Sequence, residues 1–456
     1  MPFKQKTADL TTGPLLPKII VFAMPLALSG ILQLLFNAAD VVVVGRFAGS
    51  QALAAVGSTT SLVNLLVNLF IGMSVGANVL TARALGAHDH IAVKNTVHTS
   101  VLLSLIGGFI LAVIGVCFSR PLLELMGSPD DVIDLSALYL RIVFLGMPVN
   151  MLYNFGAALL RAVGDTRRPL YCLAFSGCIN VALNLVFVIA LHMSVAGVAL
   201  ATIISQAISA VLVVWLLMHE EGPLKLELKK LHLHPMALTQ IMSIGIPAGL
   251  QGAVFSLSNV VIQSSINSFG SVIVAGNSAA SSIEGFVYVG MNAFAQASTT
   301  FTSQNFGARK YENIRKVLLN CLLCVFIVGA VLGVGATMGG NTLCGIYSSD
   351  PAVIAAGVNR LSVICQLYFI CGLMDVISGS MRGIGYSVLP MVVSLVGSCA
   401  LRLVWVATIF RFVGTVNSLY ISYPISWTLT ALTHLFCFIY AMGKLKKAQP
   451  QEHIPL

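Results

Sequence analysis

Long apolar segments constrain the fold of this chain more than any other feature. Only 9% of the residues are charged, whereas soluble domains carry roughly 25%. An apolar run of about 18 residues or more crosses a bilayer as an α-helix. The sequence therefore predicts an all-α integral membrane protein with twelve transmembrane helices, over residues 18–44, 53–80, 96–119, 134–156, 170–191, 196–217, 238–265, 273–300, 316–337, 353–378, 389–410 and 418–442.

The distribution of basic residues predicts the orientation. An even number of spans places both termini on one side, and most of the 25 Lys and Arg fall in loops on that side. The loops on the other side hold Arg46, Arg120 and Arg411. Because cytoplasmic loops are enriched in Lys and Arg, we expect both termini in the cytoplasm and the protein in the plasma (inner) membrane. The net charge of +9 then reflects topology and not nucleic-acid binding.

The chain contains an internal repeat with a constant spacing. Five pairs of residues recur 221 positions apart: Gly49 and Gly270, Gly86 and Gly307, Arg161 and Arg382, Gly164 and Gly385, Pro169 and Pro390. Each half has an even number of spans, so the repeat predicts two parallel six-helix bundles related by a pseudo-twofold axis along the membrane normal. We expect an N-terminal bundle over 1–218, a cytoplasmic connector over 219–236 and a C-terminal bundle over 237–456.

The first predicted helix carries a carboxylate inside its apolar run. Gln33, Asn37 and Asp40 fall at i, i+4 and i+7, so they share one helix face. A charged side chain in hydrocarbon costs roughly 2.5–3.5 kcal/mol even on the membrane-insertion scale, which gives the lowest values. Asp40 is therefore expected to face the bundle interior or a water-filled cavity, where it can hold a proton or a cation. The alternative is a structural hydrogen bond or ion pair. At the repeat spacing Asp40 aligns with Val261, which places this function in the first half.

Other polar residues within predicted helices extend this hypothesis. Asn180 and Asn184 lie one turn apart, and Thr202 lies in the next helix. Their neutral oxygens suit a monovalent ion or a hydrogen-bond relay. The alternative is that these side chains only hold neighbouring helices together. Polar stripes predict a substrate cavity lined also by Asn64, Asn68, Glu284, Tyr288 and Asn292. Asp375 and Arg402 form a possible second polar network, or neutralise each other.

Motifs for catalysis or metal binding are weak. The pair Cys321 and Cys324 lies inside an apolar segment without a second pair, and the His-x-His pairs lie in loops. Asp165 lies in a loop, far in depth from Asp40, so an aspartyl protease is not expected. There is no phosphate loop of the G-x-x-x-x-G-K type. We expect no catalytic residues, no metal and no cofactor.

Several motifs together resemble the multidrug and toxic compound extrusion (MATE) transporters. They are PLALSGILQLLFNAADVVVVG in the first helix, Gly-Ala at 86 and again at 307, and the loops LRAVGDTRRP and MRGIGYSVLP. The resemblance implies a V-shaped molecule of two bundles that exports cationic, amphipathic compounds in exchange for H⁺ or Na⁺. It also implies that Asp40, Asn180 and Thr202 form the ion site, with Asn184 where many members have an acid, and that Pro25 is a helix bend.

Two alternatives stay open at this stage. The coupling ion can be H⁺ or Na⁺, because one carboxylate with three neutral oxygens suits either. A lipid-carrier flippase of the same broad superfamily is the second function considered, and it would need a basic cavity. The residues within the helices are balanced in charge, which favours organic cations: Arg141, Arg360 and Arg402 against Asp40, Glu284 and Asp375. We expect a monomer with small-molecule organic cations and the lipid bilayer as its partners.

Overall fold

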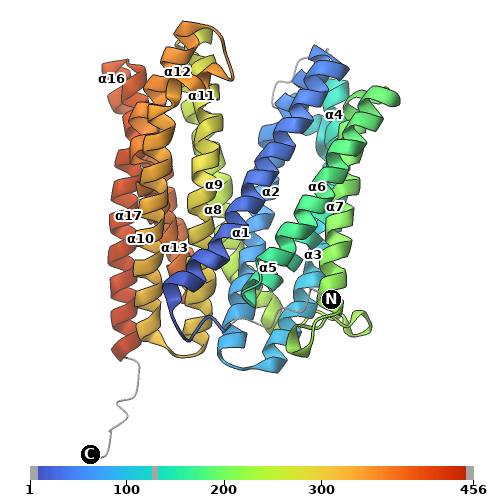
Figure 1. The fold of residues 1–456 in the computed structure, drawn as a ribbon, viewed down its shortest axis with the longest axis vertical. Helices are drawn as coiled ribbons and strands as arrows, with labels where there is room; N and C mark the ends of the chain where they lie inside the picture. Colours follow the sequence, from blue (N-terminus) through green and yellow to red (C-terminus); the bar gives the residue numbers. More distant parts are fainter. Residues whose placement is uncertain (1–8, 126–131, 448–456) are drawn as a thin grey trace, which may run out of the picture. The chain divides into compact units, whose positions relative to one another are not determined.

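The computed structural model describes residues 9–125 and 132–447, and this part of the chain is helical with no strand (Figure 1). The helices of the first half and the two turns that follow it are α1 (Leu15–Val43), η1 (Val44–Ala48), α2 (Ser50–Gly86), α3 (His90–Leu125), α4 (Ile133–Leu145), α5 (Met147–Ala162), α6 (Arg167–Asn184), η2 (Leu185–Ala190), α7 (Ser194–Met218), η3 (Gly222–Leu224) and η4 (Leu228–Lys230).

The second half begins with α8, and its helices keep the same order of long and broken elements. They are α8 (Pro235–Asn267), α9 (Ser271–Gly307), α10 (Tyr311–Met338), α11 (Gly340–Gly345), α12 (Pro351–Ile364), η5 (Cys365–Leu367), α13 (Phe369–Gly383), α14 (Val388–Ser394), η6 (Leu395–Ala400), α15 (Leu401–Trp405), η7 (Val406–Phe410), α16 (Arg411–Val413) and α17 (Val416–Lys447).

Ten described helices are long and apolar enough to cross a membrane, and twelve spans result if each of two bent pairs counts as one. The bent pairs are α4 with α5, at 45°, and the α12–η5 segment with α13, at 42°. The prediction of twelve spans in an all-α membrane fold is confirmed. The first bend lies at Gly146, just before the proline at the start of α5. A proline in the first turn favours the start of a new helix.

Contacts divide the chain into two compact units. Unit 1 holds residues 1–257 and 300–314, and unit 2 holds 258–299 and 315–456. In unit 1, α3 packs against α4 and α5, and α6 packs against α1 and α7. In unit 2, α12, α13, α14 and α15 pack against α17. The domain boundaries predicted from the sequence stay a prediction.

The backbone repeats with the same spacing as the sequence. Gly49 and Gly270, each just before a long helix, have φ values of 90° and 91°. His88 and Arg309, also 221 residues apart, have φ values of 56° and 57°. Positive φ is rare for residues other than glycine. Its recurrence at one spacing shows that the two halves share their turns as well as their helices.

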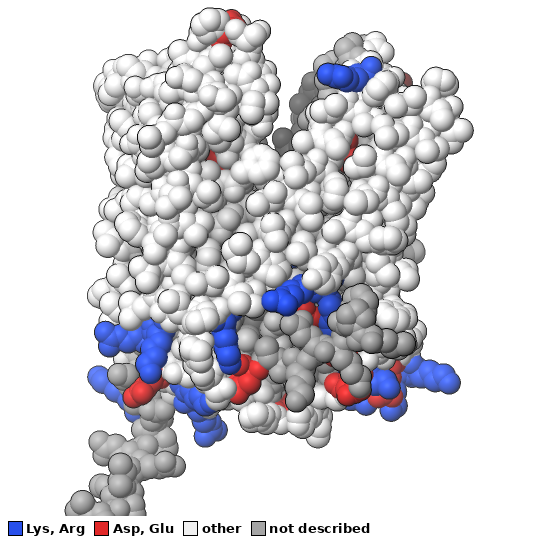
Figure 2. Space-filling view, in the orientation of Figure 1, with Lys and Arg blue, Asp and Glu red and all other residues white. Residues whose placement is uncertain are grey.

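Charged side chains mark the ends of the helices. On the face drawn in Figure 2, Lys and Arg of each unit gather mainly at one end, and the surface of the spans is almost free of charge. In unit 1, Lys94 of α3 and Lys230 of the connector both bind the carboxylate of Glu227, at 2.8 Å and 2.5 Å. These hydrogen bonds, that from Lys230 first, lower the pKa of Glu227 to about 2.

Candidate ion-coupling site

Three helices of unit 1 bring the predicted ion-site residues together. Asn184 of α6 donates its amide Nδ2 to Oδ1 of Asp40 in α1. Thr202 Oγ1 of α7 lies 3.5 Å from Oδ2 of the same carboxyl group. Asn180 completes the group, with its Nδ2 3.5 Å from Thr202 Oγ1 and its Oδ1 3.3 Å from the Asn184 amide. The four side chains form one continuous network around a single carboxylate.

Burial differs between the members of this network. Asn180 and Asn184 are buried, whereas Asp40 and Thr202 are half-buried. The carbonyl oxygen Oδ1 of Asn184 is buried without a hydrogen-bond donor in the described structure. An unsatisfied buried acceptor costs about 1–3 kcal/mol, so a ligand that fills this position gains free energy.

An apolar cluster closes one end of the site. Val44 lies one turn after Asp40, Val188 one turn after Asn184, and Val198 one turn before Thr202. All three are at most 2% exposed and belong to one core cluster. In the opposite direction along α1, Asn37 and Gln33 are exposed. The site is therefore bordered by buried apolar residues on one side and by the polar stripe of α1 on the other.

Irregular helix geometry accompanies the site. The π-helical segment η1 follows Asp40 within one turn, and η2 begins directly after Asn184. A π-helical segment inside an α-helix is frequent at functional sites, because it redirects side chains and frees backbone carbonyl groups. Neither segment was predicted from the sequence. Tyr139 of α4, which packs against the apolar cluster beside the site, was not predicted either.

The other predicted cavity residues of unit 1 lie outside this network. Asn64 is exposed, and Asn68 donates its amide to Ser256 Oγ at 3.2 Å. Pro25 lies inside α1, where Ser29 Oγ donates to the Pro25 carbonyl oxygen at 2.9 Å.

Unit 2 places its predicted polar residues in two groups. Tyr288 donates its hydroxyl to Asp375 Oδ2 at 3.2 Å, and Asn292 donates to the Tyr288 hydroxyl at 3.3 Å. Glu284 is elsewhere: Arg360 of α12 donates Nε and Nη2 to its two oxygens, at 2.8 Å and 2.7 Å. The sequence did not predict this buried ion pair, because its partners are 76 residues apart.

Asp375 and Arg402 do not neutralise each other. Asp375 accepts from Tyr288, whereas Arg402 donates Nε to Ser426 Oγ at 2.9 Å. The second polar network considered from the sequence therefore consists of two groups with separate partners.

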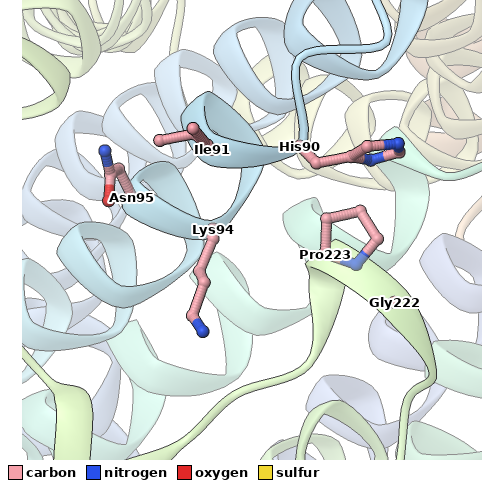
Figure 3. Close-up of a pocket in the computed structure, with 6 residues that line it drawn as sticks. All are labelled: His90, Ile91, Lys94, Asn95, Gly222 and Pro223. Atoms are coloured by element: carbon pink, nitrogen blue, oxygen red, sulfur yellow. The ribbon is translucent and has the colours of Figure 1, made fainter.

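A pocket of a different kind lies beside the connector. It is formed where the start of α3 faces η3, and it is lined by His90, Ile91, Lys94, Asn95, Gly222 and Pro223 (Figure 3). None of the predicted site residues contributes to it. The described residues contain no group of three or more His, Cys, Asp or Glu side chains placed to hold a metal ion.

Comparisons with known proteins bear on this architecture. The MatE family model matches residues 25–186 and 247–408. The "Probable multidrug resistance protein YoeA" of Bacillus subtilis is 29% identical over 382 residues, 82% of each chain. The "FAD transporter" of Shewanella oneidensis is 23% identical over 424 residues, 91% of this chain and 93% of that one.

A solved structure shows the same fold. The crystal structure of MATE in complex with MaL6 matches with a TM-score of 0.91 and 21% identity, and covers 98% of this chain and 100% of that chain. The two matched stretches of the family model begin 222 residues apart, in agreement with the internal repeat.

Proposed function

Because the chain belongs to the MATE family of multidrug efflux transporters, we propose that it exports organic cations in exchange for H⁺ or Na⁺. The observation that supports this most is the network of Asp40, Asn180, Asn184 and Thr202. It places one carboxylate and several neutral oxygens, drawn from three helices, inside a membrane-spanning unit. Such an arrangement holds one positive charge and releases it when its helices move.

The oxygens of the network suit either coupling ion. Na⁺ is a hard cation that prefers carboxylate, carbonyl and hydroxyl oxygens, and the unpaired Oδ1 of Asn184 offers one beside Asp40. A proton on Asp40 instead turns the carboxyl group into a donor, for which Asn180 Oδ1 and Thr202 Oγ1 are the nearest acceptors. In both cases the occupant neutralises the charge of Asp40. An uncompensated charge is costly in a low-dielectric region.

Exchange follows from competition for this charge. When Asp40 is neutralised, the site no longer attracts a cationic compound, and when it is free, it does. A ligand shifts a conformational equilibrium only through its different affinities for the two states. We propose that loading of Asp40 changes the curvature of α1 at Pro25, because a proline removes a hydrogen bond inside a helix and permits a bend.

The proposed substrate class, organic cations, is based on the uncharged polar residues of the two units. Gln33, Asn37 and Asn64 are exposed in unit 1, and we propose that they line the path of the compound. Tyr288 and Asn292 beside Asp375 are proposed to do so in unit 2. Glu284 was predicted for this surface, but both of its oxygens bind Arg360, and we propose a structural role for it. We further propose that the protein works as a monomer in the cell membrane with both termini in the cytoplasm.

Transport into everted vesicles tests the coupling. Vesicles carrying the protein are given a fluorescent organic cation with either an acidic interior or a sodium-loaded interior, one gradient at a time. We expect accumulation with one gradient and its loss when that gradient is collapsed by an ionophore. Accumulation that follows neither gradient would contradict antiport with H⁺ or Na⁺.

A further inference from the structure

A short segment before the first helix packs against a corner of the second repeat. We refer to residues 9–13, which precede α1, as the strap. Within unit 1 the strap meets the corner where α9 is followed by α10. Leu10 is only 2% exposed there. Its backbone N–H donates to Gln304 Oε1 at 3.3 Å, and its carbonyl oxygen accepts from Asn305 Nδ2 at 3.1 Å.

Two further side chains of the corner hold the strap. Lys310 donates its Nζ to the carbonyl oxygen and to the hydroxyl oxygen of Thr11, at 3.2 Å and 2.9 Å. Asn313 donates its Nδ2 to the same carbonyl oxygen at 3.0 Å. These hydrogen bonds join the strap to side chains of the corner and not to its backbone. The strap can therefore detach without unfolding a helix on either side.

The amide group of Gln304 connects the strap to a third element. Its Nε2 donates to the carbonyl oxygen of Ala162, in the last turn of α5, at 2.6 Å, while its Oε1 accepts from Leu10. Gln304 is buried, so one enclosed amide group joins the strap, α5 and α9. A buried polar group that loses one partner destabilises the arrangement that it leaves. We therefore expect the strap contact and the α5 contact to form and to break together.

The crossing of α2 and α9 beside the strap follows the internal repeat. A Cβ atom at Gly86 would lie 2.0 Å from the carbonyl oxygen of Gln304, and one at Gly307 would lie 2.0 Å from that of Arg83. Both glycines, and both carbonyl residues, are 221 positions apart. Only glycine lets two backbones approach this closely. The two repeats thus meet here through equivalent residues, and Gln304 belongs both to this crossing and to the strap contact.

The connector repeats the arrangement of the strap in the opposite direction. Its residues 231–234 lie 221 positions after residues 10–13 and directly precede α8. The backbone N–H of His234 donates to Thr99 Oγ1 of α3 at 3.0 Å. The segment before the first repeat is therefore held by the second repeat, and the segment before the second repeat is held by the first.

We propose that the strap is a releasable lock that keeps α2 and α9 together at this end of unit 1. In the proposed orientation this end faces the cytoplasm, where an exporter takes up its compound, so the two helix ends separate here in each cycle. A contact that exists in only one of two states shifts their equilibrium by its free energy in that state. The inference rests on the proposed transport function and adds to it a device that sets how often the protein opens at this end.

Hydrogen exchange of backbone amides, followed by mass spectrometry on the purified full-length protein, tests the lock without any gradient. Lys310→Met removes two exposed hydrogen bonds to the strap, and Leu10→Asp places a charge where the strap is buried. We expect residues 301–308 of α9 to exchange about tenfold faster in Lys310→Met, the change typical of one charge-assisted hydrogen bond. Residues 79–86 of α2 should accelerate with them, and Leu10→Asp should have the larger effect on both segments.

The matched control removes a neighbouring charge that does not hold the strap. Lys316 is exposed on α10, and Lys316→Met should exchange as the wild type does. The end of α2 gives the decisive result, because its exchange reports separation from α9 and not loosening of the strap itself. Unchanged exchange of α2 in both strap variants would overturn the proposal, even if the strap and α9 exchange faster. An equal acceleration in Lys316→Met would also overturn it.

Transport separates the lock from the proposed function. In everted vesicles this end faces the dye, and the apparent affinity of a site falls with the fraction of molecules in which it is open. We expect Lys310→Met to lower the half-saturating dye concentration, and an unchanged or higher value would overturn the role of the lock in transport. If exchange changes as expected but the wild type accumulates no dye, coupled export fails and the lock stands. If the wild type accumulates dye and the exchange of α2 is unaltered, export stands and the lock fails.

Discussion

Removal of one partner of the buried ion pair in unit 2 is expected to destabilise the protein strongly. The side chains of Arg360 and Glu284 are 6% and 8% exposed, and two hydrogen bonds of 2.8 Å and 2.7 Å join them. Arg360 also donates to Asn277 at 2.5 Å. Breaking a buried pair from one side costs about 3–5 kcal/mol, because an uncompensated charge remains. Glu284→Gln should therefore shift the unfolding equilibrium by about two to four powers of ten.

An exposed ion pair of the same kind supplies the control. Arg120 and Glu124 are 52% and 58% exposed and lie 3.2 Å apart, and an exposed pair contributes only about 0–1 kcal/mol. Unfolding is followed by the reaction of a fluorogenic thiol probe with cysteines that are buried in the folded state, such as Cys321 and Cys365. Glu284→Gln should lower the midpoint of thermal unfolding well below the wild type, and Glu124→Gln should not.

A double substitution tests the physical reason. If the cost comes from the unpaired charge, Glu284→Gln combined with Arg360→Met should recover most of the lost stability, because replacing both partners by uncharged groups is often neutral. Equal midpoints for Glu284→Gln and Glu124→Gln would refute the reasoning, as would a double variant less stable than the single one.

Three further predictions follow from other parts of the chain. A Cβ atom at Gly72 would lie 2.2 Å from the backbone of Gly249, so Gly72→Ala should lower the free energy of unfolding by about 1–3 kcal/mol, whereas Gly57→Ala, with open space around it, should not. The pKa of Glu227 is lowered from 4.5 to about 2 by Lys230 and Lys94. The stability that this ion pair gives the connector is therefore complete above about pH 4.5 and is lost as the pH falls toward 2. Cleavage of the connector by an acid-stable protease should rise only below about pH 4, and a rise between pH 7 and 5 would contradict this. Pro25→Ala should reduce transport of a fluorescent cation more than it reduces the thermal midpoint, and normal transport by this variant would remove the support for bending at Pro25.

The sequence predicted the spans and the ion-site cluster from different kinds of information. Apolar length and the 221-residue repeat gave the helices, and helix periodicity placed Gln33, Asn37 and Asp40 on one face. That Asn184 and Thr202 meet Asp40 depends on helices far apart in the sequence, and it could be expected only through the family resemblance. The structure confirms the contact, whereas the role of the cluster in coupling stays a proposal.

Other features could not be read from local patterns. The prediction ended one span at residue 300, because the following residues are polar, but α9 continues to Gly307. These polar residues are buried by partners in unit 1: Gln304 accepts from the Leu10 amide, and Asn305 donates to the Leu10 carbonyl group. The pairing of Glu284 with Arg360 likewise depends on tertiary packing, which hydropathy does not record.

Uphill transport by an Asp40→Asn variant tests the central claim most directly. Everted vesicles with wild type, Asp40→Asn or Asp375→Asn receive the driving gradient and a fluorescent organic cation, and accumulation above the external concentration is measured. If Asp40 couples the ion to export, Asp40→Asn loses accumulation although it folds, and Asp375→Asn retains gradient-driven accumulation. Accumulation by Asp40→Asn at the wild-type level would contradict the account and place the coupling acid elsewhere in the chain.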